Sequence, residues 1–465
     1  MKNRKPFNWI NEESVTFLRR GYLSEGEEPL DRIKTIAEHA EKLLGKEGFA
    51  DKFYDYMSKG WYSLSSPVWA NFGKERGLPV SCFGSNVSDS IESILFTQAE
   101  VGEMSKMGGG TSGYFGNIRG RGAKITDNGH APGAVHFMNL FQSVVDNISQ
   151  GATRRGRFSP YLPVEHPDIM EFLEIGTEGA SIQDLTHAVT VTDKFMEEMI
   201  AGDDEKRKIW AKVIQRRGEI GYPYIMFHDT MNNNAPKVYQ DKGAKIYNSN
   251  LCSEIALHNS EDESFVCVLS SMNVLHYDEW KDTDAVETMV YFLDAVVTEY
   301  CNKLEELRDN GTREGKMAFL YMEKAYNFAK RQRALGLGVL GWHSLLQSKG
   351  LAFDTRETAK LNVGRRNVTL NAVAPTTSSA FILGQVSQSI EPIWSNCYVK
   401  DVAKMKVTIK NPVLKELLDS MGRDNKETWD SIKKGDGSVQ HLDFLSDEQK
   451  DVFRTFAEIN QSSII

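Results

Sequence analysis

The stretch Asn250-Leu251-Cys252-Ser253-Glu254 places an amide, a thiol and a carboxylate at alternate positions. Successive side chains of an extended segment point to opposite faces, so an extended conformation would put Asn250, Cys252 and Glu254 on one face. Such a face offers a nucleophile or radical site, a general base and a hydrogen-bonding amide. Polar groups on a buried face are costly unless they have partners or a function. The stretch therefore predicts a catalytic loop around Cys252.

Two further cysteines lie in short apolar runs. Cys82 and Cys267 are each flanked by residues typical of a buried strand. A lone buried cysteine is ordinarily a small hydrophobic residue of the core, and this structural alternative stays open for both. We expect Cys301 to be structural, because it lies on a predicted helix, and we assign no role to Cys397.

Length, charge and cysteine content narrow the class of protein. The 465 residues, 40% of them hydrophobic, suit one very large domain or roughly two to three ordinary ones. The net charge of −9 argues against a protein that coats nucleic acid. No apolar run reaches the ~18–20 residues of a membrane helix, and the N-terminus lacks the apolar core of a secretory signal. Five scattered cysteines predict a reducing, cytoplasmic protein without a disulfide framework.

A glycine-rich, basic region follows a helix that we expect to begin near Asp89. Asp89 is the expected N-cap, with Glu92 completing a capping box. Gly108 to Gly110 predict a flexible loop that approaches a ligand closely, and the glycines and arginines of 117–133 extend this region. The arginine cluster at 154–157 predicts a loop that contacts an anion. For both regions the alternative is an ordinary solvated loop.

Helices and strands alternate along most of the chain. We expect helices over 31–44, 137–148 and 283–304 and buried strands over 187–191 and 221–227. Residues 65–73 are expected to be a turn-rich connection, and 372–379 a strand that opens into a hydroxyl-rich turn suited to phosphate. The alternation favours an α/β fold after an all-helical N-terminal portion, with the chemistry on loops at one end of a barrel.

Taken together, these segments resemble the catalytic large (α) subunit of ribonucleotide reductase, from about Asn8 to the last residues. The pieces that carry the resemblance are Asn248 to Ile255, Ser81-Cys82 with Asp89-Ser90 beyond it, Val266 to Asn273, and Ala374 to Ser378 followed by Ile390-Glu391-Pro392. The resemblance implies a helical portion over residues 1–75 and a catalytic barrel over 76–465. The barrel would have ten strands in two half-barrels and a central finger loop.

The resemblance implies ribonucleotide reduction by a cysteine thiyl radical, which supplies deoxyribonucleotides for DNA synthesis. Cys252 would become the radical and abstract the substrate's 3′ hydrogen. Glu254 would take the 3′-hydroxyl proton, and Asn250 would hydrogen-bond the ribose. Cys82 and Cys267 would deliver two electrons as the 2′-hydroxyl leaves as water, and they would end as a disulfide.

Two nucleotide sites also follow from the resemblance. The expected substrate contacts are Ser66, Ser81, Gly122, Pro375, Thr376, Thr377, Ser378 and Ser379. The expected contacts to a deoxynucleotide effector, at a dimer interface, are Asp89, Ser90, Arg119 and Lys124. The specificity loop between the two sites would contain Arg154, Arg155 and Arg157. We expect no metal site, because the cysteines lack the short spacing of zinc ligands.

The implied partners are a ribonucleotide, a radical-generating small (β) subunit, a thioredoxin-like or glutaredoxin-like reductant and a second copy of the chain. The substrate could be a diphosphate or a triphosphate. The chain itself would bind no cofactor, and adenosylcobalamin is the alternative radical source. An alternative function is a nucleotide-binding dimer that is catalytically incomplete without a separate C-terminal piece. No nucleic acid or membrane partner is expected.

The sequence departs from the family pattern in three places. Almost nothing precedes the catalytic region, so we expect no N-terminal ATP-cone. The span from Phe353 to Asn367 is shorter than the pattern. The chain stops at Ile464-Ile465, before the family's tyrosine pair and C-terminal cysteine pair. We therefore expect turnover to need a further C-terminal segment, supplied in cis or in trans.

Overall fold

The chain folds into two compact units in a computed structural model that describes residues 5–127, 129–151, 155–355, 372–402 and 405–463. The first unit comprises Met1–Gly73, Leu269–Ala295 and Gly336–Ile465. The second comprises Lys74–Val268 and Val296–Leu335. The strand β7 (Phe265–Asn273) and the helix α13 (Ala285–Asp309) each begin in one unit and end in the other.

The second unit is built on a curled sheet of parallel strands. These strands are β2 (Cys82–Asn86), β3 (Gly110–Tyr114), β4 (Phe158–Pro163), β5 (Ala188–Val191) and β6 (Tyr224–Phe227). Each strand pairs in parallel with the next one in the chain, and the beginning of β7 pairs antiparallel with β2. Helical connections are what parallel strands require. The expected α/β half-barrel is thus confirmed.

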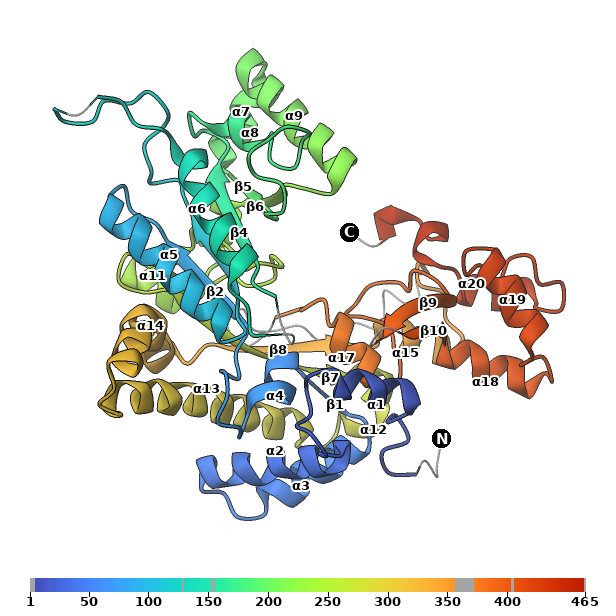
Figure 1. Ribbon diagram of the computed structural model, residues 1–465. Coiled ribbons are helices and arrows are strands. Elements are labelled where there is room, and N and C mark those ends of the chain that lie inside the picture. Colours follow the sequence, from blue (N-terminus) through green and yellow to red (C-terminus); the bar gives the residue numbers. More distant parts are fainter. Residues whose placement is uncertain (1–4, 128, 152–154, 356–371, 403–404, 464–465) are drawn as a thin grey trace. The chain divides into compact units, whose positions relative to one another are not determined.

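Helices cover this sheet (Figure 1). They are α5 (Ile91–Lys106), α6 (Ala134–Asn147), α7 (Ile169–Phe172), α8 (Asp193–Ala201), α9 (Asp204–Ile220), α10 (His228–Asn233), α11 (Lys237–Lys242) and α14 (Arg313–Gln332). The helix α5 packs against α6, α14 and β3. Aromatic rings fill the core between helix and sheet, since Phe141 stacks on Phe158 at 4.8 Å and meets Phe115 edge-on at 5.1 Å. This packing fixes the ends of β2, β3 and β4, where the predicted site lies.

The glycine run leads into a buried strand, so Gly110 does not belong to the flexible loop that was expected. The strand β3 begins at Gly110. A Cβ atom on Gly109 would lie 2.5 Å from the Phe83 ring, and one on Gly110 would lie 3.0 Å from Cδ2 of Leu251. Side chains are excluded here because a strand and the loop of residues 250–254 approach β3 closely.

The first unit contains the N-terminal helices and the C-terminal part of the chain. Its elements are α1 (Glu12–Arg19), α2 (Pro29–Leu44), α3 (Phe49–Ser58), β1 (Tyr62–Leu64), α4 (Ser66–Asn71), η1 (Val274–His276), α12 (Tyr277–Trp280), β8 (Leu335–Leu340), α15 (Trp342–Ser348), α17 (Thr377–Ile382), β9 (Cys397–Val402), β10 (Met405–Lys410), α18 (Pro412–Ser420), α19 (Lys426–Lys434), α20 (Asp447–Val452), η2 (Phe456–Glu458) and η3 (Gln461–Ser463). β1 pairs antiparallel with the end of β7, and β8 also pairs with β7. The described strands form one eight-stranded and one two-stranded sheet, where the resemblance implied ten strands in a barrel.

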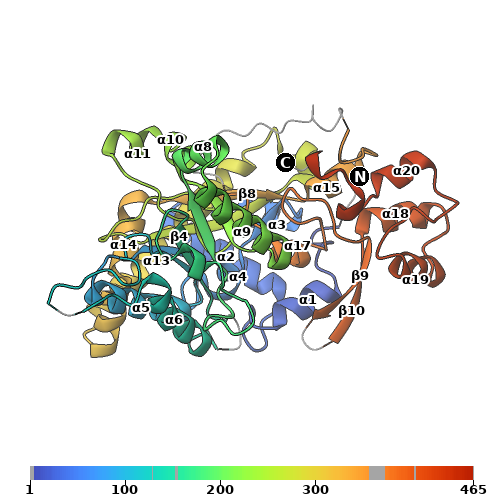
Figure 2. The ribbon, with the colours of Figure 1, turned by 90° about the horizontal axis from the view of Figure 1, so that it is seen from above.

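A small separate core holds the C-terminal helices together. The β9–β10 hairpin lies beside α18 and α19, as Figure 2 shows. Cys397 is buried in this core with Leu414, Leu418 and Trp429. No helix among the described residues has both the length and the apolar character to cross a bilayer.

Three local expectations are wrong. Residues 66–71 form α4, whose last carbonyls accept hydrogen bonds from the fully buried Arg32, at 2.9 Å from Nε to the Trp69 oxygen. The hydroxyl-rich turn is the start of helix α17. Ser90, and not Asp89, caps α5. The shortened span at 353–367 lies largely outside the described residues, in the gap at 356–371.

Candidate active site

The loop around Cys252 is a tight turn and not an extended segment. Ser253 has a φ of 66°, and its N–H donates to the Asn250 carbonyl at 3.2 Å. The alternation of side chains on one face therefore does not occur. Asn250 is buried, whereas Cys252 is exposed at the tip of the turn. The arrangement of these side chains therefore comes from the turn and not from an extended strand.

Asn250 holds the turn and reaches a second cysteine. Its Oδ1 accepts hydrogen bonds from the N–H groups of Glu254 at 3.1 Å and Ile255 at 3.2 Å. Its Nδ2 donates to the Sγ of Cys82 at 3.4 Å. The Asn250 amide thus joins the start and the end of the turn to each other and to the strand β2.

Cys82 and Cys267 are direct partners in the antiparallel ladder of β2 and β7. Paired antiparallel residues have Cα atoms ~4.5–5.5 Å apart, which is within the ~7 Å limit for a disulfide. Both side chains are buried, and neither is in a disulfide. Burial raises the pKa of both thiols, and the nearby charge of Glu254 raises it further. Both therefore remain protonated at neutral pH, able to supply hydrogen atoms or protons.

Glu254 provides a carboxylate with a perturbed pKa beside these thiols. Burial raises the pKa of Glu254, and the Asn250 amide opposes this shift. Within the described part of the chain, the buried Oε2 of Glu254 has no hydrogen-bond partner. A carboxylate with a raised pKa and a vacant acceptor position is suited to act as a general base.

Tyr161 on β4 is a site residue that the sequence did not reveal. Its hydroxyl donates to the Asn250 carbonyl at 2.9 Å and lies 3.1 Å from the hydroxyl of Ser253. It therefore braces both ends of the turn that presents Cys252. A tyrosine within a buried apolar strand needs a partner for its hydroxyl, and this was the available signal.

A hydrogen-bonded network fixes the stem of the same loop to the sheet. Ser112 on β3 donates to the Ser249 carbonyl at 2.7 Å and accepts from Asn248 at 3.0 Å. Asn259 donates to the side chain of Asn248 at 2.7 Å. All four residues are buried. Buried hydrogen-bond networks of this kind help to hold one backbone geometry.

Ser81 and Gly122 are the predicted substrate residues of the second unit. The Ser81 hydroxyl is 3.6 Å from Sγ of Cys82, so this residue adjoins the cysteine pair. Gly122 lies in an exposed loop with a φ of 82°, where its N–H donates to the Ala131 carbonyl.

Hydrogen bonds join three of the four predicted effector residues, and the fourth, Ser90, follows Asp89 in the chain. The carboxylate of Asp89 accepts from the Nε of Arg119 at 2.6 Å. Arg119 also donates to the Lys124 carbonyl at 3.0 Å, and the Ser90 hydroxyl accepts from the Ser93 N–H at 3.1 Å. These contacts gather all four residues at the start of α5.

In the arginine cluster, Arg155 and Arg157 are exposed, and the Arg157 carbonyl accepts from Thr111 on β3. Arg154 lies outside the described residues.

The remaining predicted substrate residues belong to the first unit. Ser66 is the first residue of α4. Thr376 has a φ of 49° and precedes α17, which starts at Thr377 and contains Ser378 and Ser379. The Thr376 hydroxyl accepts from the Ser389 N–H at 2.8 Å, which fixes this turn. Pro375 is exposed just before it.

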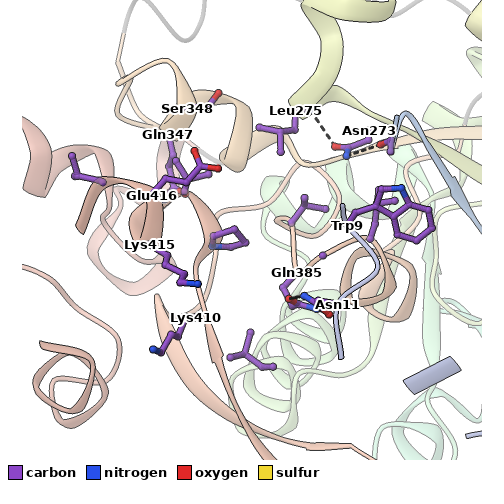
Figure 3. Close-up of a pocket in the computed structure, with 18 of the residues that line it drawn as sticks. Trp9, Asn11, Asn273, Leu275, Gln347, Ser348, Gln385, Lys410, Lys415 and Glu416 are labelled. Atoms are coloured by element: carbon purple, nitrogen blue, oxygen red, sulfur yellow. Dashed lines mark hydrogen bonds between the residues drawn. The ribbon is translucent and has the colours of Figure 1, made fainter. Parts of the chain in front are cut away.

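A cavity of about 740 Å³ lies in the first unit and is lined by none of these residues. Figure 3 shows Trp9, Asn11 and Gln385 on one side and Lys410 and Lys415 on the other. Its amides are already engaged, since Asn11 donates to Gln385 at 2.7 Å. The chemistry predicted from the sequence is therefore not placed in this cavity.

Comparisons with known proteins identify the family of the chain. The model of the ribonucleotide reductase all-alpha domain matches residues 9–77, and that of the ribonucleotide reductase barrel domain matches 80–206, 202–363 and 360–465. A protein of Frog virus 3 (isolate Goorha), named as a ribonucleoside-diphosphate reductase large subunit, is 33% identical over 92% of this chain and 81% of its own length. The large subunit of Danio rerio is 26% identical over 98% of this chain and 68% of its own.

A solved structure gives the same result. The class Id ribonucleotide reductase alpha subunit of Actinobacillus ureae is 48% identical, with a TM-score of 0.89, covering 99% of this chain and 89% of that one. The family models together span nearly the whole sequence. The chain belongs to the ribonucleotide reductase large-subunit family.

Proposed function

We propose that this chain reduces ribonucleoside diphosphates to deoxyribonucleotides by a thiyl-radical mechanism. The observation that carries the proposal is the pairing of Cys82 with Cys267 beside a braced turn that presents Cys252 and Glu254. Two adjacent thiols can deliver two electrons by becoming a disulfide. The diphosphate is favoured over the triphosphate because the similar large subunits are named as diphosphate reductases.

Each group has a distinct task in the proposed reaction. The Cys252 thiyl takes the 3′ hydrogen atom, and Glu254 accepts the 3′-hydroxyl proton. The 2′-hydroxyl leaves as water with one proton from the Cys82–Cys267 pair, C2′ gains the other thiol hydrogen, and oxidation of the pair to a disulfide supplies the two electrons. Glu254 returns its proton to the 3′ oxygen. Cys252 then returns the hydrogen atom to C3′ and is a radical again. Asn250 orients the ribose and keeps the turn in place.

The radical would come from a separate small subunit and not from adenosylcobalamin. The similar solved structure is an alpha subunit of class Id, and this supports a partner subunit as the radical source. A dithiol reductant of the thioredoxin or glutaredoxin type would reduce the disulfide after each turnover. We further propose that the active form is a homodimer with an all-helical portion over 1–75 and the barrel over 76–465.

Nucleotide binding is proposed on the residues named above. Ser66, Ser81 and Pro375 to Ser379 would contact the substrate phosphates, with Gly122 near the substrate. An effector at Asp89, Ser90, Arg119 and Lys124 would change substrate preference through the loop of Arg154, Arg155 and Arg157. The contact between Asp89 and Arg119 supports this grouping. The Arg119 guanidinium already binds one anionic group there, and it could bind a phosphate of the effector in the same way.

The decisive experiment is a reduction assay of the polypeptide with a ribonucleoside diphosphate, an effector, dithiothreitol and, in trans, the C-terminal segment that turnover is expected to need. One arm contains a class I small subunit and the other contains adenosylcobalamin. Deoxynucleotide formed only with the small subunit supports the proposal. Activity with adenosylcobalamin alone would contradict the radical source, and nucleotide binding without reduction in either arm would favour a purely binding role.

A further inference from the structure

A fully buried carboxylate lies beyond the cysteine pair, on the helix α5. Glu100 accepts hydrogen bonds from the Ser85 hydroxyl at 2.8 Å and from the Ser264 hydroxyl at 2.7 Å. The two serine hydroxyls are 3.3 Å apart. All three side chains are buried, with Glu100 and Ser264 at 0% exposure.

The two serines occupy equivalent places on the strands that hold the cysteines. Ser85 is three residues after Cys82 on β2, and Ser264 is three residues before Cys267, just ahead of β7. Because the ladder is antiparallel, both serines lie at the same end of it. Three residues along a strand correspond to about 10 Å, so Glu100 does not touch the thiols.

The buried carboxylate of Glu100 has a desolvation cost, so its presence calls for an explanation. Desolvation of an ionised carboxylate is costly, and an apolar residue would fill the same space without that cost. Burial raises the pKa of Glu100, whereas the two hydroxyls and the charge of Lys324 on α14 favour its ionised form. The serines are its hydrogen-bond partners, and each lies on a different one of the two chain segments.

Other contacts also bear on the register at this end, because β2 pairs with β3 along its whole length. Gly84 has no side chain, and the place of its Cβ is taken by the ring of Phe265, 2.1 Å away. A slip of one strand by one residue would turn that strand's side chains to the opposite face and separate the cysteines. A clamp that bonds one serine from each strand prevents that slip.

We propose that Glu100 is a positioning residue, which fixes the register of β2 and β7 through Ser85 and Ser264 and thereby sets the pairing of Cys82 with Cys267. The importance of this pairing for turnover rests on the proposed function. The geometry of the thiol pair does not depend on the proposed function. The thiol–disulfide equilibrium that reports this geometry can be measured without nucleotide.

The test measures the thiol–disulfide equilibrium of the pair in glutathione buffers, with peptide mapping by mass spectrometry. In this reaction the Cys82 and Cys267 thiols lose two protons and two electrons to form one disulfide, and one glutathione disulfide becomes two glutathione thiols. The full chain carries Cys252→Ser in every sample, because this removes the exposed thiol. Glu100→Gln, Ser85→Ala and Ser264→Ala are compared with Glu103→Gln, which alters a carboxylate of α5 that pairs with Lys106.

We expect the equilibrium constant for disulfide formation to fall about five- to tenfold in Glu100→Gln and in each serine variant, as loss of a buried hydrogen bond implies. Glu103→Gln should leave it unchanged, and thermal unfolding should show that the compared variants are folded. If Glu100→Gln does not fold, the two serine variants decide the question alone.

An unchanged equilibrium in both serine variants, or an equal fall in Glu103→Gln, would overturn the proposal. A shifted equilibrium in a protein without reductase activity would support the clamp while contradicting the proposed function. The two claims are therefore tested separately.

Discussion

Cys82 and Cys267 are paired residues of one antiparallel ladder, so two thiols from segments far apart in the sequence face each other beneath the loop that presents Cys252. This pairing predicts that the two sulfurs join without backbone rearrangement.

A single turnover without added reductant should link Cys82 to Cys267, because the reaction takes its two electrons from this pair. Peptide mapping of the quenched protein checks this, with the nucleotide-free protein as control. About one disulfide per deoxynucleotide formed is expected under this two-electron stoichiometry. Product accompanied by two reduced cysteines at these positions would refute the assignment.

Tyr161→Phe should lower kcat by about tenfold, since it removes a hydroxyl that braces the turn by up to two hydrogen bonds. KM and the unfolding temperature should change little, because the ring and its packing are retained. Steady-state kinetics test this, with Tyr114→Phe on the neighbouring strand β3 as the matched control. Equal kcat values in Tyr161→Phe, Tyr114→Phe and the wild type would show that the hydrogen bonds of the Tyr161 hydroxyl do not contribute to catalysis.

The acid side of the pH–rate profile should reflect Glu254. Its pKa is raised above the ordinary glutamate value by burial, and it must be ionised to accept a proton. Activity is therefore lost as the pH falls through a value above ~4.5. Glu254→Gln should abolish this dependence and lower kcat by about 10²–10⁴-fold, the usual contribution of a general base. A profile in Glu254→Gln that keeps both the rate and the acid limb would contradict this role.

Two glycine substitutions should shift stability in opposite directions. Gly84→Ala puts a Cβ 2.1 Å from the Phe265 ring and should reduce the free energy of unfolding by about 1–3 kcal/mol through overpacking. Gly218→Ala in α9 meets no atom within 4 Å and should raise it by up to about 1 kcal/mol through helix propensity. Urea denaturation of both variants measures the difference, and a Gly84→Ala protein as stable as the wild type would disprove the close approach.

The sequence predicted what was local or periodic. Apolar spacing predicted α2 and α13 closely, and strand-like runs located β2, β5 and β7. The family resemblance brought Cys82, Cys252 and Cys267 into one site before any geometry was available.

What the sequence did not predict depends on distant contacts. The turn at Cys252 needs Tyr161 and the network around Asn248, and α4 is capped by Arg32 from another helix. The glycines near residue 110 resemble a loop in sequence, but they serve as close-packing positions in β3. Short segments take their conformation from such partners, which local patterns do not encode.

The central claim is that Cys252 starts the reaction as a radical. Its most direct test is deoxynucleotide formation by Cys252→Ser with a ribonucleoside diphosphate, an effector, dithiothreitol, the small subunit and the C-terminal segment supplied in trans. Cys301→Ala, which alters a buried cysteine of α13, is the control and should remain active. We predict that Cys252→Ser binds nucleotide like the wild type and forms no product above background. Product at a rate near that of the wild type would contradict the mechanism.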